Sequence, residues 1–173
     1  MSSEPPFEYV RVTAGLIASQ LDLQPEQVTL ANQRFTMPTD DRLYVSLSVI
    51  NSKQISSKVA YETDLLDNSL IEVRSVTAQE TYLIVCYSLG GEARRRAWEI
   101  AAALSGTAAQ QAMEKYSFKL AKVSSSVREM ATADGASRIN RYGLTYRALV
   151  AYRTTKPVDY FDQFAQPVVS SNP

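Results

Sequence analysis

The fold is decided by the stretch Tyr82–Leu104, which reads YLIVCYSLGGEARRRAWEIAAAL. Its first part, Tyr82–Tyr87, is an unbroken run of apolar residues with the aromatic and branched side chains typical of a central strand. Gly90 and Gly91 interrupt the run. From Glu92 the apolar residues return at the spacing of an amphipathic helix. A strand that turns tightly into such a helix predicts a domain in which the helix packs on a sheet.

The helix at 92–104 has a predicted buried stripe and a predicted polar side. Glu92 suits the positive end of the helix dipole, and Gly106 suits a left-handed cap after the last turn. The adjacent Arg94, Arg95 and Arg96 fan over a wide arc and lie off the apolar stripe. We expect the stripe to consist of Ala93, Ala97, Trp98, Ile100, Ala101 and Leu104.

Before this stretch, the sequence predicts one helix and one clear strand. Apolar residues recur at helical spacing from Phe7 to Leu21, and Pro6 suits the start of that helix. Strict alternation over Leu43–Ile50 predicts a strand. Asn51–Lys53 is then predicted to be a turn, and Ile55–Tyr61 a weaker polar strand or a loop.

The remaining segments complete a sheet. Leu70–Ser88 predicts either two strands around residues 78–80 or one strand bent by a bulge. A short helix is expected over Ala108–Met113, a strand over Phe118–Ser124, and a last long strand over Tyr142–Thr154 that Lys156 and Pro157 end. The order predicts an α+β fold, a mostly antiparallel sheet packed by an N-terminal helix and a central helix on one face.

The length of 173 residues favours one domain. We expect a loose N-terminal lead at 1–6, a single α+β domain at 7–155 and a C-terminal arm at 156–173. The arm carries Tyr160, Phe161 and Phe164, where a solvated end would be polar. These aromatic side chains either fold back on their own domain or grip a neighbouring subunit.

The composition excludes several classes of chemistry. The chain has no histidine and the single cysteine Cys86, so a Ser-His-Asp triad, a Cys-His dyad, an imidazole metal site and an intrachain disulfide are all excluded. No glycine precedes a lysine, which argues against a phosphate-binding loop. We therefore expect no enzyme, no cofactor and no metal. Cys86 lies in the most apolar segment and is expected to be buried.

Paired carboxylates are the remaining catalytic candidates. Asp40 and Asp41 lie between a proline loop and a strand, where a turn role is the more common one. Asp159 and Asp162 lie in the C-terminal arm, which is a poor place to hold a catalytic geometry. A small enzyme that uses carboxylates alone stays the less favoured alternative.

The only basic cluster is Arg94, Arg95 and Arg96. Its side chains form either a solvated face or a contact with acidic groups of another subunit. Eighteen Lys and Arg balance eighteen Asp and Glu, so electrostatic attraction to nucleic acid is the weakest explanation. The N-terminus lacks a signal peptide, and no apolar run is long enough to span a membrane, so we expect a soluble protein made in the cytoplasm.

The order of these motifs resembles the bacteriophage neck terminator, or tail terminator, family. The likeness covers Phe7 to about Phe164, and the residues that carry it are Asn32-Gln33-Arg34, Met37-Pro38, Leu43–Ile50, Leu83–Tyr87, Gly90–Leu104, Val127–Met130 and Tyr142–Arg153. The proline loop at Phe35–Asp40 is poorer than is usual in the family, and Gln166–Pro173 has no counterpart there.

The resemblance implies a virion structural protein, made in the bacterial cytoplasm, that acts in the neck. Family members form a ring, usually of six subunits, which caps the tail tube and joins the tail to the head-completion or adaptor proteins and the portal. Genomic DNA passes through such a ring without sequence-specific binding, and no membrane is involved. No catalytic or cofactor residue is carried over. The alternative within the same class is another virion connector or a baseplate subunit. The subunit-interface candidates are Arg94, Arg95, Arg96, Tyr160, Phe161 and Phe164.

Overall fold

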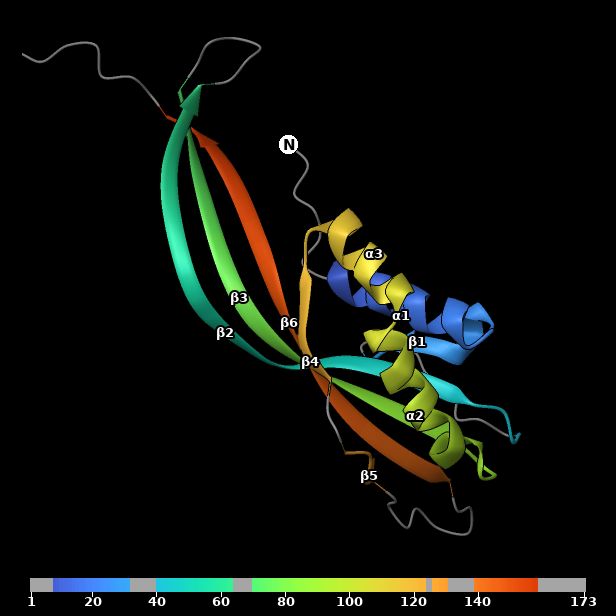
Figure 1. The fold of residues 1–173 in the computed structure, drawn as a ribbon. Helices are drawn as coiled ribbons and strands as arrows, with labels where there is room; N and C mark the ends of the chain where they lie inside the picture. Colours follow the sequence, from blue (N-terminus) through green and yellow to red (C-terminus); the bar gives the residue numbers. More distant parts are fainter. Residues whose placement is uncertain (1–7, 32–39, 64–69, 124–125, 131–138, 159–173) are drawn as a thin grey trace, which may run out of the picture.

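The computed structural model describes residues 8–31, 40–63, 70–123, 126–130 and 139–158. These residues form an α+β fold in which the α-helices lie on one face of a mostly antiparallel sheet (Figure 1). The sheet order is β1-β2-β3-β6-β4, and β5 pairs with another part of β6. Only β1 runs parallel to its neighbour β2. The predicted fold class is confirmed.

In chain order the elements are α1 (Glu8–Gln20), the 3-10 turn η1 (Pro25–Gln27), β1 (Val28–Leu30), β2 (Tyr44–Thr63), β3 (Leu70–Ser88), α2 (Glu92–Ser105), α3 (Thr107–Tyr116), β4 (Lys119–Val123), β5 (Arg128–Glu129) and β6 (Asn140–Pro157). The predicted helices are therefore present, and the strand predicted over Phe118–Ser124 corresponds to β4. The strand β1 was not predicted; three residues are too few for a periodic signal.

The hydrophobic core lies between the helices and one half of the sheet. Ile17 of α1 and Ile100 of α2 are fully buried against Leu47, Ile84 and Leu144 of the central strands. Burying such a side chain stabilises the fold by about 1.5–3 kcal/mol. The core ends near Val150, whereas the strands continue well beyond it.

The turn predicted at Asn51–Lys53 is wrong, because β2 runs without a break to Thr63. It stays paired with β3 over its whole length, and two β-bulges at Ile50 and Ile55 each insert one extra residue. The polar residues that suggested a turn are tolerated because this part of the strand is exposed. A bulge also shifts the side-chain alternation, which hides the strand from a search for strict period two.

The two long strands beside β2 are also continuous. Leu70–Ser88 is a single strand, and the bulges belong to its partner β2. The last strand, β6, is longer than predicted at both ends, since Lys156 and Pro157 still pair with Glu72 and Ile71. Proline is compatible with that position because it ends the strand.

Two details of α2 differ from the prediction. Trp98 is not in the core: its side chain is 52% exposed, while Ala93, Ala97, Ile100 and Leu104 are buried as expected. A helical residue next to Ala97 is rotated by about 100°, which turns Trp98 away from the sheet. Gly106 is not left-handed, since its φ of −83° and ψ of 176° are extended; it ends α2 and begins α3.

Candidate assembly surface

The sheet continues past the helical layer as a three-stranded projection. Figure 1 shows β2, β3 and β6 curving away together from the helices. We call this part the β-extension and define it as residues 55–63, 70–77 and 151–157. At about 3.3 Å per residue it is roughly 25 Å long. No helix of the described residues covers it (Figure 1), and its β2 strand is exposed along the whole of 55–63 apart from the half-buried Ala60.

Large apolar side chains of the β-extension are exposed. Ile55, Val59 and Tyr61 are 54%, 54% and 61% exposed, and Val49 and Ile50 at its root are exposed as well. Single exposed apolar residues are normal, but a row of them along one strand marks a contact surface. These side chains do not contribute to the core of their own subunit.

The outer edges of the β-extension lack strand partners among the described residues. β1 pairs with β2 only as far as Leu47, and β4 pairs with β6 only at Tyr146–Leu149. Such edges present free N–H and C=O groups to another chain. The β2 edge carries two bulges together with Lys53 and Lys58, which are devices that discourage uncontrolled edge pairing. Contact through side chains is therefore favoured over simple strand addition on this edge.

An aromatic cluster fixes the β-extension to the helical layer. The Tyr9 hydroxyl of α1 donates a hydrogen bond to the Ala151 carbonyl across 3.0 Å. The Tyr9 ring packs against Phe118 and meets Tyr152 edge-on, with ring centroids 5.6 and 6.4 Å apart. Helix α1 therefore holds the strands at the point where they leave the body.

A buried carboxylate lies beside this cluster. Glu80 is buried in the middle of β3, and it accepts hydrogen bonds from the hydroxyls of Tyr82 and Tyr152. Burial, reinforced by these bonds to Glu80, raises the pKa of both tyrosine hydroxyls well above the usual value. The hydroxyls therefore remain protonated donors at neutral pH. This network joins β3 to β6 at the root of the β-extension.

The helix-free face of the sheet is basic, although the chain has zero net charge. Cross-strand partners share a face, and the registers of β2, β3 and β6 place these residues together. The single carboxylate among the β2, β3 and β6 residues of this face, Glu62, pairs with Arg153 at 2.8 Å. The basic residues of the face are Lys53, Lys58, Arg141, Arg147 and Arg153.

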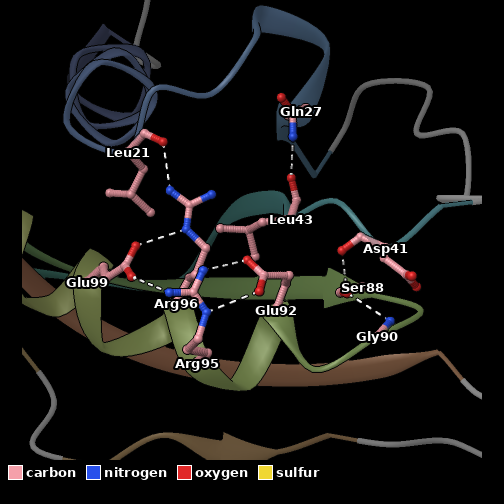
Figure 2. A network of polar contacts seen from close by, with 10 residues as sticks. All are labelled: Leu21, Gln27, Asp41, Leu43, Ser88, Gly90, Glu92, Arg95, Arg96 and Glu99. Carbon is pink, nitrogen blue, oxygen red and sulfur yellow. Dashed lines mark hydrogen bonds and ion pairs between the residues drawn. The ribbon is translucent and has the colours of Figure 1, made fainter.

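Two of the predicted interface arginines are engaged within the subunit (Figure 2). Arg95 pairs with Glu92 at 2.7 Å and with Glu99 at 3.4 Å. Arg96 pairs with Glu99 at 2.9 Å and donates a hydrogen bond to the Leu21 carbonyl at 2.7 Å, which ties α2 to the end of α1 (Figure 2). The intramolecular role of Arg96 was not predicted.

Arg94 is the arginine of the cluster that faces solvent without an ion pair among the described residues. Four residues further on, the exposed Trp98 lies on the same side of α2. The structure thus places a cation and an aromatic ring together on the outer side of this helix. Tyr160, Phe161 and Phe164, the other interface candidates, lie outside the described residues.

The polar candidates for chemistry have structural roles. Asp40 accepts bonds from the backbone and side chain of Arg42 at the start of β2, and these bonds lower the pKa of its carboxyl. The Asp41 carbonyl accepts a hydrogen bond from the Ser88 hydroxyl at 3.0 Å (Figure 2). Cys86 is fully buried, and burial raises the pKa of its thiol to about 12. Asp159 and Asp162 lie outside the described residues.

Within the described part of the chain, no group of three or more acidic or cysteine side chains is placed to hold a metal ion. None of the helices there is long and apolar enough to cross a membrane.

Sequence reasoning missed the β-extension. Residues 53–63 carried a signal for a strand, because the β-branched and aromatic residues Ile55, Val59 and Tyr61 favour strand conformation. They are interspersed with polar residues, as on an exposed strand. The bulge at Ile55 breaks the alternation and made this segment resemble a loop. Extended structure was predicted over Leu70–Ser88 and Tyr142–Thr154, but the excess length of these strands over the core was not.

No protein-family model and no curated protein matches the chain. Among solved structures, a chain described as "Virion of native gene transfer agent (GTA) particle" is similar over 78% of this chain and 84% of that chain. The identity is 17% and the TM-score is 0.30.

Proposed function

We propose that this protein is a structural subunit of a bacteriophage virion, where copies of it form a closed ring in the neck. The ring caps the tail tube and joins the tail to the head-completion or adaptor proteins and the portal. The observation that carries the proposal is the β-extension, an exposed three-stranded projection with no covering layer among the described residues. The ring size of six and the neck position rest on the resemblance of the sequence to tail terminators.

The β-extension needs a partner for physical reasons. A strand ribbon with little hydrophobic burial is marginally stable in water. Its exposed Ile55, Val59 and Tyr61 gain free energy only when another surface covers them. A binding partner explains both the length of the strands and the apolar side chains along them. This supports a role in assembly.

A projection on one side of a subunit that meets a different surface on the next subunit gives a heterologous contact. Such contacts close into a ring when the rotation between subunits divides a full turn. Zero net charge allows like subunits to approach without overall repulsion. Self-association through the β-extension therefore fits a ring better than a two-fold dimer.

The basic helix-free face supports the proposal that DNA passes close to the protein. Lys53, Lys58 and Arg147 attract a polyanion through charge alone, without reading its bases. We therefore propose that genomic DNA passes through the ring without sequence-specific binding. The proposal assigns no catalytic role to the chain, no cofactor and no contact with a membrane.

Mass measurement of the purified protein tests the ring. Native mass spectrometry is expected to show a closed oligomer of about six chains, and negative-stain microscopy is expected to show a ring. A strictly monomeric protein at high concentration would contradict the proposal. Labelled antibody on virions then separates the neck from the alternative positions, since another connector or a baseplate subunit would be marked elsewhere.

A pair of substitutions tests whether the β-extension makes the contact. Val59→Ser together with Tyr61→Ser removes two exposed apolar side chains and is expected to abolish the ring while circular dichroism stays unchanged. Lys58→Ser is the matched control, because Lys58 directly precedes Val59 in the strand and lies on the opposite face of the sheet. Equal loss of the ring in the control would show that the apolar side chains are not the cause.

A further inference from the structure

The helical layer has a groove on its outer side that its own subunit leaves open. The groove lies between α1 and α3, has a volume of about 530 Å³ and is mostly apolar. Its lining includes Arg11, Val12, Gly15 and Leu16 of α1 and Ala112 and Tyr116 of α3. A cleft of this size is sufficient for one or two aromatic side chains.

Packing among the described residues does not require a glycine at position 15. Gly15 lies in the middle of α1 and is exposed, and a Cβ atom added there would meet nothing within 4 Å. Glycine inside a helix is unfavourable relative to alanine. The missing side chain leaves this part of the groove lining open.

Two cationic side chains lie at the groove, Arg11 in its lining and Lys115 beside it. Arg11 is exposed and has no ion pair among the described residues. Lys115 lies next to Tyr116, with its ammonium 5.1 Å from the centre of that ring. An occupant that combines aromatic rings with carboxylates would match both the apolar floor and these two cations.

The C-terminal segment Asp159–Phe164 has this chemistry. Its sequence is DYFDQF, with two carboxylates and three aromatic rings. We infer that this segment of one subunit occupies the α1–α3 groove of a second copy. The inference rests on the proposed self-association and names the surface that receives the arm.

Reach favours a second copy over the same subunit. The bond from Tyr9 to Ala151 places the start of α1 beside a point on β6 that lies six residues before Pro157. That is roughly 20 Å back along the strand, and α1 then runs further from the tip of the β-extension (Figure 1). Phe161 lies four residues after Pro157 and reaches at most about 14 Å. This backbone reach is shorter than the span back to the start of α1, and Gly15 lies further along that helix, so reach favours the Phe161 of a second copy.

Disulfide trapping between separately purified variants tests this contact. Chains with Gly15→Cys are mixed with chains carrying Phe161→Cys under mild oxidation, so that a product between the two can form only between subunits. The buried Cys86, with its raised thiol pKa, does not compete. We expect a disulfide-linked dimer of the two chains, which reductant reverses. Absence of this product from mixtures that form rings would overturn the inference.

Two controls keep the result specific. Tyr61→Cys lies near the tip of the β-extension and is expected not to cross-link to Gly15→Cys. A stronger cross-link at Tyr61 than at Phe161 would show that the β-extension itself fills the groove, which overturns the inference. An intrachain disulfide in the double variant Gly15→Cys/Phe161→Cys would do the same, since it would place the arm on its own subunit.

Filling the groove is the second test. Gly15→Leu is expected to leave the thermal unfolding temperature unchanged or higher, because the added side chain meets open space and favours the helix. Assembly should weaken about tenfold or more, as for loss of an aromatic anchor. A wild-type protein that never forms rings would refute the proposed function, whereas rings of equal affinity in wild type and Gly15→Leu would refute only the groove contact.

Discussion

The rings of Tyr82 and Tyr146 stack at the root of the β-extension, with centroids 4.6 Å apart and planes inclined by 7°. They are direct cross-strand partners on β3 and β6, and both are almost completely buried. Burial raises the pKa of both hydroxyls well above the usual tyrosine value. An ionised hydroxyl would place a charge in this buried stack, so the packing of the two strands favours the neutral side chains.

Alkaline pH is predicted to destabilise the fold. Burial raises the pKa of the Tyr146 hydroxyl and raises that of the Cys86 thiol to about 12, so the folded chain keeps both protons in mildly alkaline solution. The unfolded chain releases these protons nearer pH 8.5–10. Because the folded state binds more protons, stability is complete below pH 8 and falls as pH rises, by up to about 1.4 kcal/mol per pH unit for each group. Urea unfolding at pH 7–11 measures this slope, and Tyr146→Phe should reduce it. An equal slope in wild type and variant would contradict the assignment.

The carboxylate of Glu80 is predicted to stabilise the junction between body and β-extension. Glu80→Gln keeps the volume but replaces one of the two acceptor oxygens that Tyr82 and Tyr152 use. We expect a loss of about 1–3 kcal/mol in the free energy of unfolding. Glu62→Gln is the control, because its surface pair with Arg153 contributes less than about 1 kcal/mol. Urea denaturation compares the two, and equal losses would show that the buried network adds nothing.

The sequence predicted the elements that have one buried side and missed those that have none. Positions such as Ile17, Val45 and Ile100 alternate or recur with the period of their elements, so the helices and the half-buried strand were predicted correctly. Residues 51–63 have no buried side to impose a period. Their strand conformation comes from pairing with β3, which is a tertiary effect that overrides local propensity.

Among the interface candidates, too, some features follow from the local sequence pattern and others depend on tertiary packing. The off-stripe position of Arg95 follows from helical period alone, but the bond from Arg96 to the Leu21 carbonyl depends on how α1 packs on α2. Trp98 was assigned to the core from its apolar character, and only the packing of Ala97 and Ile100 shows which side of α2 is buried. The α1–α3 groove joins helices distant in sequence, so no local pattern predicts it.

The bulge at Ile55 is predicted to be removable without unfolding the protein. Deleting Ile55 leaves Gln54 and Ser56 opposite Ala78 and Thr77, so every later pair of β2 and β3 is kept. Thermal unfolding should change by only a few degrees, since the lost side chain is exposed. Deletion of Ser75 in β3 is the contrasting variant. β3 pairs with β6 without a bulge, so this deletion shifts the register of β3 against β6 and should be much more destabilising.

The last prediction separates the structural arginine from the assembly surface on α2. Arg96→Ala removes the donor to the Leu21 carbonyl and is expected to cost about 1–2 kcal/mol in the free energy of unfolding, measured by urea denaturation. Arg94→Ala should cost less than about 0.5 kcal/mol, because Arg94 is exposed without an ion pair among the described residues. The double variant Arg94→Glu/Trp98→Ala should therefore fold normally. If the outer side of α2 contacts a neighbour, the double variant loses affinity for the ring, since a reversed charge and a lost aromatic ring both weaken a desolvated contact. Rings that assemble as well as those of the wild type would exclude this side of α2 from the interface.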